Sequence, residues 1–135
     1  MTDPRIAASF AQQSMMTSLH ARLVSAHAGR CVISAPLLPA FRQQHGAAHA
    51  AVAFAVGDSA AGYAALSLMP EGQEVMTVEM KINLLSPAMG EGLEAVGDVL
   101  RAGRRLTVVR AEVVALQGGA RKTVALLQGT MIGVS

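Results

Sequence analysis

The sequence has few aromatic residues and little charge. It has no tryptophan, one tyrosine and three phenylalanines, so it lacks the stacking platforms with which proteins bind single-stranded nucleic acid. Only 15% of its residues are charged, against about 25% in an ordinary soluble domain. These shortages argue against nucleic acid as a partner, and they predict that part of the surface is covered by subunit contacts.

Cysteine and targeting signals are also scarce. The one cysteine, Cys31, excludes an intrachain disulfide and a cysteine-cluster metal site.

The first ten residues lack a basic segment followed by an apolar run, so we expect no secretory signal and a cytoplasmic location. Residues 47–69 are long enough to span a bilayer, but their small side chains and central Asp58 favour a buried helix without membrane contact. The length predicts one domain, residues 1–135.

Positive charge is concentrated in the last third of the chain. From residue 101 onward Glu112 is the only acid, and the basic residues are Arg101, Arg104, Arg105, Arg110, Arg121 and Lys122. Two interpretations remain open for this segment. It is either a solvated face that keeps the protein in solution or a site for a ligand that carries phosphate.

Two helices are predicted. Asp3-Pro4 is typical of a helix start, and apolar residues at roughly helical spacing continue the pattern over residues 4–19. Residues 46–66 are good or neutral helix formers apart from Gly57 and Gly62, and they are apolar on every side. A helix of this kind must be covered by other elements.

Runs rich in β-forming residues supply that cover. Two short runs precede the apolar helix and four long runs follow it, and the short links predict antiparallel neighbours in a meander. This order predicts an α+β fold in which a curved antiparallel sheet wraps around a long central helix. The expected strands are residues 21–26, 30–37, 74–86, 91–102, 104–117 and 122–134.

Asp58 is the only carboxylate between residues 45 and 69. Burying an unpaired charge costs free energy, so this acid either faces solvent, caps a kink in the helix, or is retained as a general base. The polar residues that we expect near it are Gln43, His45, His49 and Thr77.

Other chemistries lack their motifs. Ser59 lacks the second glycine of a nucleophile elbow, and His45 and His49 lack the glutamate of a zinc-binding H-E-x-x-H helix. No phosphate-binding loop or dinucleotide fingerprint is present. We therefore expect no metal and no redox cofactor.

Three separated blocks resemble one family. They are residues 43–52 (QQHGAAHAAV), residues 57–59 (GDS) and residues 77–88 (TVEMKINLLSPA). Their order and spacing are similar to those of the small hotdog-fold acyl-CoA thioesterases of the phenylacetate-pathway (PaaI) type, from about Leu19 to the C-terminus. The resemblance implies a hotdog fold and hydrolysis of a thioester to a free acid and CoA, which is part of the substrate.

The resemblance also implies catalytic roles. Asp58 would activate water or attack the thioester directly, and Thr77 would align the water. Gln43 would help to bind the thioester carbonyl, His49 would order the loop that enters the helix, and the backbone N–H of Ala50 would stabilise the oxyanion. A helix N-terminus suits that last role because it presents free N–H groups and a partial positive charge.

Further residues are expected to bind substrate. His45, Gly46 and Ser59 come from the matching blocks. Two glycines of the family pattern are Ala50 and Ala51 here, which keeps the backbone donor but narrows the space on the acyl side. CoA carries phosphates, and the candidates to bind them are Arg104 and Arg105 at the predicted turn.

The spacing of Ala50 and Asp58 predicts a shared site. Eight residues span about 12 Å along a helix, whereas an oxyanion donor and a base must both lie within about 3 Å of the reacting atoms. We therefore expect a composite site in a homodimer or a dimer of dimers. The alternatives are a non-catalytic hotdog module that binds acyl-CoA or scaffolds a partner, a hotdog dehydratase, for which no Asp/His pairing is found, and an unrelated structural oligomer.

Overall fold

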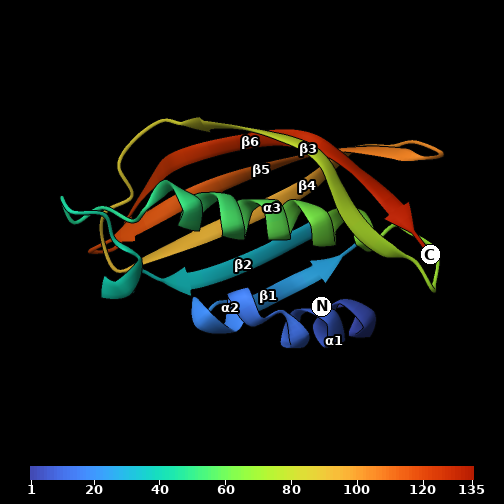
Figure 1. Cartoon of the computed structure of the whole chain (residues 1–135), viewed down its shortest axis with the longest axis horizontal. Helices are drawn as coiled ribbons and strands as arrows, with labels where there is room; N and C mark the ends of the chain where they lie inside the picture. Colours follow the sequence, from blue (N-terminus) through green and yellow to red (C-terminus); the bar gives the residue numbers. More distant parts are fainter.

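Six strands form one antiparallel sheet that curves around a central helix, α3 (Ala50–Leu66) (Figure 1). The computed structural model describes residues 1–135. The strand order is β1-β2-β4-β5-β6-β3. This is the hotdog fold, so the predicted α+β class is confirmed. The strands are β1 (Arg22–His27), β2 (Arg30–Pro36), β3 (Glu74–Leu84), β4 (Gly92–Ala102), β5 (Leu106–Gln117) and β6 (Ala120–Val134).

The N-terminal segment forms two helices, α1 (Pro4–Gln12) and α2 (Ser14–Ser18), so the prediction of one helix over residues 4–19 is wrong. Asp3 caps α1 as expected, because its side chain accepts a hydrogen bond of 2.9 Å from the backbone N–H of Arg5. The break is at Gln13, whose backbone is extended. It allows each short helix to bury its own apolar residue, Ile6 in α1 and Met16 in α2.

The central helix begins four residues later than its composition suggests. Gly46 has a φ of +92°, a left-handed conformation that cannot continue a helix, and residues 46–49 form a loop. His49 is the N-cap of α3: its Nδ1 accepts a hydrogen bond of 3.0 Å from the backbone N–H of Ala51. None of the helices is long and apolar enough to cross a membrane.

Strand β3 is at one edge of the sheet, and this corrects the predicted four-strand meander. Only β4, β5 and β6 form a meander, whereas β3 pairs with β6. The link of residues 85–91 carries the chain over the end of the sheet to β4, which pairs with β2 (Figure 1). One side of β3 is therefore left without a paired strand, and its exposed side chains include Met76, Val78 and Leu84.

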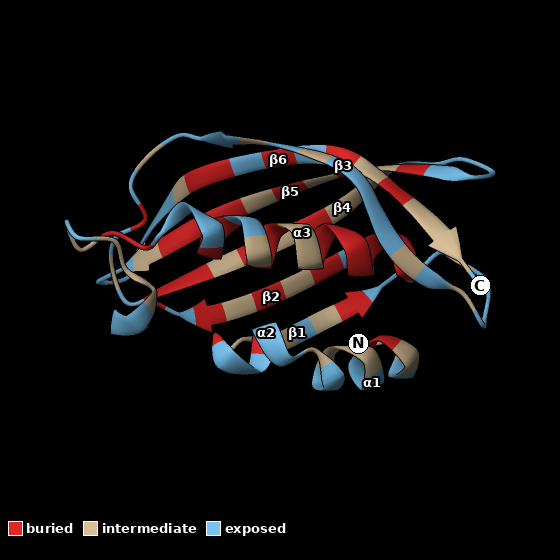
Figure 2. Cartoon of the chain, in the orientation of Figure 1, coloured by how far each residue is buried: buried red, intermediate tan, exposed pale blue.

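Small residues bring α3 close to the sheet. A Cβ atom at Gly97 of β4 would lie 2.4 Å from the carbonyl group of Ala60, so only glycine fits beneath the helix at this point. The face of α3 opposite the sheet is open at its N-terminal half: Ala50 and Ala51 are exposed, and Phe54 is 37% exposed (Figure 2). The expected cover of this apolar helix is thus incomplete in a single chain.

Candidate active site

Asp58 lies half-buried on α3 and is paired with a residue of β3. Its Oδ1 accepts a hydrogen bond of 2.8 Å from Oγ1 of Thr77. Burial raises the pKa of Asp58 above its usual value, and the hydrogen bond from Thr77 offsets part of this effect. A carboxylate with a raised pKa and one free oxygen is suited to accept a proton from water.

A cavity of about 190 Å³ surrounds this carboxylate. Its walls come from α3, from β3 and β6, and from the N-terminal helices. The lining residues are Ser9, Gln13, Asp58, Ser59, Gly62, Tyr63, Glu74, Val75, Thr77 and Met131.

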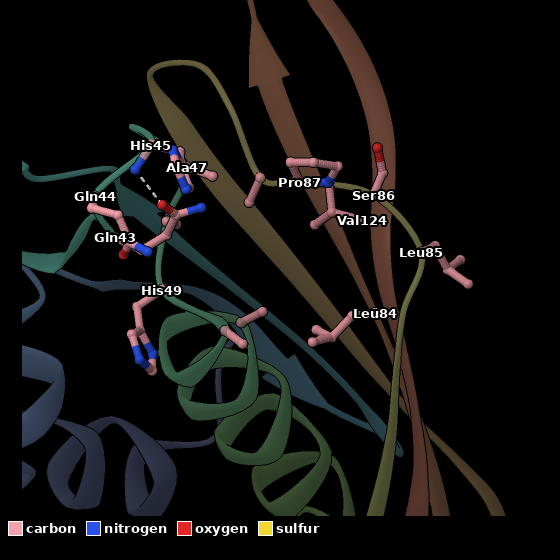
Figure 3. Close-up of a pocket in the computed structure, with 14 residues that line it drawn as sticks. Gln43, Gln44, His45, Ala47, His49, Leu84, Leu85, Ser86, Pro87 and Val124 are labelled. Atoms are coloured by element: carbon pink, nitrogen blue, oxygen red, sulfur yellow. Dashed lines mark hydrogen bonds between the residues drawn. The ribbon is translucent and has the colours of Figure 1, made fainter.

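The loop that enters α3 presents the side-chain amide of Gln43. The loop is a tight turn, in which the N–H of Gln43 donates to the carbonyl of Ala47 at 2.7 Å and the N–H of Gly46 donates to the carbonyl of Gln43 at 3.0 Å. The Oε1 atom of Gln43 accepts a hydrogen bond from the N–H of His45 (Figure 3). Its side-chain NH₂ group is left free to donate to a ligand.

The backbone N–H of Ala50 has no acceptor. The next N–H groups of the helix are used, because Ala51 donates to Nδ1 of His49 and Val52 donates to the carbonyl of His49. Ala50 therefore offers one free, exposed donor at the positive end of the α3 dipole, which is the property required of an oxyanion donor.

A larger cavity of about 560 Å³ lies beside this helix N-terminus. Gln43 and His45 stand on one side of it, and Leu84 and Pro87 come from the opposite side (Figure 3). The remaining lining residues are mostly small or apolar. They are Gln44, Ala47, Ala48, His49, Ala50, Ala53, Leu85, Ser86, Ala88 and Val124.

Arg42 supports this loop, and sequence reasoning missed it. Its guanidinium donates to three backbone carbonyls, those of Gly46 at 2.8 Å and of Leu37 and Gly90 at 3.0 Å. These bonds tie the loop that carries Gln43 to two neighbouring segments. Nothing in the local sequence distinguishes this arginine from a solvated one, because its three partners are backbone atoms.

The predicted site residues fall into two separate groups. Thr77 and Ser59 share the cavity of Asp58, whereas Gln43, His45, His49 and Ala50 line the other cavity. The expectation that Gln43, His45 and His49 accompany Asp58 is therefore wrong within one chain. Their separation follows from the length of α3, which places its N-terminus and Asp58 about two turns apart.

The other expected substrate-binding residues line neither cavity. Gly46 is in the entry loop, and Ala51 is exposed on the first turn of α3. Arg104 and Arg105 are exposed in the turn between β4 and β5. Sequence reasoning also missed Ser9, Gln13 and Tyr63 in the wall of the Asp58 cavity.

Comparisons with known proteins agree with the fold. The sequence profile of a family described as Thioesterase superfamily matches residues 45–121. Among curated proteins, "Putative esterase SSO2140" of Saccharolobus solfataricus is 30% identical over 94 residues, which cover 70% of this chain. They cover 66% of that relative, slightly less than two thirds of its length.

Solved structures are similar over nearly the whole chain. A Thioesterase family protein from Silicibacter pomeroyi is 40% identical, with a TM-score of 0.94 and 96% of each chain covered. The conserved protein PA5202 from Pseudomonas aeruginosa is 30% identical, with a TM-score of 0.84, covering 95% of this chain and 99% of that one. The E. coli PaaI protein is 22% identical, with a TM-score of 0.84 and coverages of 96% and 90%, and it supports the fold alone.

Proposed function

We propose that this chain, which belongs to the Thioesterase superfamily, is an acyl-CoA thioesterase of the PaaI type whose active site is shared between two subunits. One subunit contributes Asp58 and Thr77, and its partner contributes Gln43 and the N–H of Ala50. The observation that carries the proposal is that one chain holds each half of this machinery in a different cavity.

The exposed face of α3 supports the shared site. Ala50, Phe54 and Asp58 are spaced by four residues, so they lie on one face of the helix. Two copies of α3 could pack antiparallel about a two-fold axis, with Ala50 opposite the partner's Asp58. Phe54 would then lie at the axis and contact the partner's Phe54. Phe54 is the exposed large apolar residue of this helix, as such an axis requires.

The free edge of β3 supports the same arrangement. An unpaired strand with apolar side chains is a site for pairing with another strand. β3 lies beside the open face of α3 and carries exposed Met76, Val78 and Leu84 (Figure 2). Pairing of two β3 strands would join the sheets and bring the two α3 helices together, which fits the low charge content of the chain.

The chemistry of the combined site is thioester hydrolysis. Asp58 accepts a proton from water while the water oxygen bonds to the thioester carbon, and Thr77 holds the carboxylate in place. The oxyanion that forms accepts hydrogen bonds from the N–H of Ala50 and the amide of Gln43. The C–S bond then breaks, and the CoA sulfur takes the proton from Asp58. Direct attack by Asp58 would give the same products through an anhydride that water cleaves.

The phosphates of CoA require cationic partners. Arg104 and Arg105 are exposed and form no ion pair in the structure. We keep them as the proposed contacts for these phosphates. The resemblance of the three sequence blocks supports the proposed acyl-CoA substrate and PaaI-type activity.

The test compares wild type with Asp58→Asn in the hydrolysis of aryl- and alkanoyl-CoA esters. Hydrolysis is measured as the release of the CoA thiol. Wild type should turn over repeatedly, and Asp58→Asn should lose a factor of at least about 100, as expected for removal of a general base. Cys31 can add at most one thiol per chain, so repeated turnover is easily distinguished from this background. Binding of CoA esters without hydrolysis by wild type would instead indicate a non-catalytic module.

The pH profile of wild type adds a second readout to the same experiment. Only the ionised form of Asp58 can accept a proton, so kcat/KM should fall as the pH drops through its pKa. Burial raises this pKa, so the acid limb should lie above pH 3.8, the ordinary value for an aspartate. An acid limb at or below that value would contradict the assignment of Asp58 as the base.

A further inference from the structure

The side chain of Gln13 connects the N-terminal helices to the helix that carries Asp58. At the break between α1 and α2, Nε2 of Gln13 donates to the hydroxyl of Tyr63 at 3.0 Å. Its Oε1 accepts a hydrogen bond of 3.3 Å from Oγ of Ser59, the residue after Asp58. Ser9 also lies within hydrogen-bond distance of Tyr63, at 3.1 Å. Residues remote in sequence thus build one wall of the Asp58 cavity.

Gln13 keeps hydrogen-bonding capacity for a ligand. A side-chain amide has two N–H donors and an oxygen with two lone pairs. In the structure Gln13 uses one donor toward Tyr63 and one lone pair toward Ser59. One donor and one lone pair remain at a residue that lines the cavity.

The charges of the cavity restrict what can enter it. The lining includes two carboxylates, Asp58 and Glu74, and no cationic side chain. The phosphates of CoA would be repelled there, so the nucleotide end of the substrate must lie elsewhere. The thioester carbon has to reach Asp58, so the parts of the substrate that can enter this cavity are the uncharged groups next to the thioester, among them the acyl group.

We infer that Gln13 is a specificity-determining residue, whose amide binds a neutral hydrogen-bonding group on the acyl part of the substrate. The inference rests on the proposed thioesterase function. A polar cavity wall rejects a plain hydrocarbon, because a bound hydrocarbon would cover the free donor and acceptor of Gln13 and leave them unpaired. The N-terminal helices therefore select acyl groups with a polar end over their purely hydrocarbon counterparts.

The experiment uses pairs of CoA esters that differ by one hydroxyl: benzoyl and hydroxybenzoyl, hexanoyl and 6-hydroxyhexanoyl. The ratio of kcat/KM within each pair is measured for wild type and for Gln13→Met, which keeps the shape but removes both polar functions. The wild type should favour the hydroxylated ester of at least one pair, and Gln13→Met should lower that ratio about tenfold, the upper range for one neutral hydrogen bond.

The control is Gln12→Met, the same change at the exposed neighbour, which does not line this cavity and should leave the ratio unchanged. If Gln13→Met does not fold, Gln13→Asn, whose amide is one methylene shorter, should lower the ratio in the same direction.

Three results overturn the inference. If wild type prefers the hydroxylated ester in no pair, the cavity wall that contains Gln13 does not discriminate between acyl groups. If Gln13→Met lowers kcat/KM equally for both esters of a pair, Gln13 acts through packing or contacts the pantetheine arm of CoA. Absence of turnover with every ester removes the proposed function itself, and it is distinguished from the other two because no ratio can then be measured.

Discussion

At the scale of single residues, the free N–H of Ala50 can be removed without removing a structural bond. Ala50 is the first residue of α3, and its N–H has no acceptor. Proline is well tolerated at this position of a helix. The preceding residue, His49, has φ −58° and ψ 140°, which is the backbone conformation favoured before proline.

We therefore expect Ala50→Pro to fold normally and to lose activity. Loss of one oxyanion donor lowers kcat by about 100-fold to 1,000-fold, while the melting temperature should stay close to that of wild type. Both are measured at the same protein concentration. Ala50→Gly, which keeps the N–H, reports the effect of the side chain alone. An Ala50→Pro protein with nearly full kcat would show that this N–H does not contact the oxyanion.

The residues of the site differ in how far the sequence could reveal them. Asp58 is conspicuous as the one acid in an apolar stretch, and Thr77 lies in a block that matches a family pattern. Gln13 and Arg42 carry no such signal, because their partners lie far away in sequence or are backbone carbonyls. Such residues become recognisable only when the fold has placed their partners.

At the scale of secondary structure, the close contact between α3 and the sheet depends on Gly97. Replacing it with alanine puts a methyl group 2.4 Å from the backbone of Ala60, so the helix or β4 must shift. Overpacking of this kind costs about 1–3 kcal/mol of unfolding free energy, and we expect Gly97→Ala to lower the denaturation midpoint accordingly.

Gly62→Ala is the matched control for this prediction. A methyl group at Gly62 meets its nearest neighbours at 3.8 Å, an ordinary van der Waals distance. It should therefore be neutral or stabilising, since alanine favours a helix interior by about 1 kcal/mol over glycine. Equal stability of the two variants would show that α3 is free to move away from β4.

The elements and the pairing of most sequence neighbours were predictable, but the position of β3 was not. Alternation and turn residues located all six strands. The position of β3 depends on the path of residues 85–91, and a short link is equally compatible with a neighbouring strand or with a crossing over the sheet end. The break at Gln13 was missed because its side chain contacts α3, which outweighs the helical preference of the local sequence.

At the scale of the whole molecule, one chain holds the two groups of proposed site residues in separate cavities, and it leaves one face of α3 and one edge of β3 open. The spacing of Ala50 and Asp58 predicted this separation from the sequence, since helix geometry fixes their distance along the axis. The partner surface itself could not be predicted in the same way. It depends on which strand lies at the edge beside α3, and that is a property of the assembled sheet.

The shared site predicts that two inactive variants restore each other. In a mixed dimer of Ala50→Pro and Asp58→Asn, one site carries both changes and the other carries neither. Random exchange of equal amounts should therefore recover about a quarter of wild-type activity per subunit. Activity is measured after the two proteins are unfolded and refolded together, with each variant refolded alone as a baseline.

The matched control for this mixture pairs two changes from the same half-site. Ala50 and Gln43 are proposed to enter each site from one subunit, so every site of an Ala50→Pro and Gln43→Ala mixture keeps one defect. This mixture should stay at the level of its parents. Recovery in both mixtures would indicate that exchange merely improves refolding, and recovery in neither would place the complete site within one chain, against the division that the two cavities suggest.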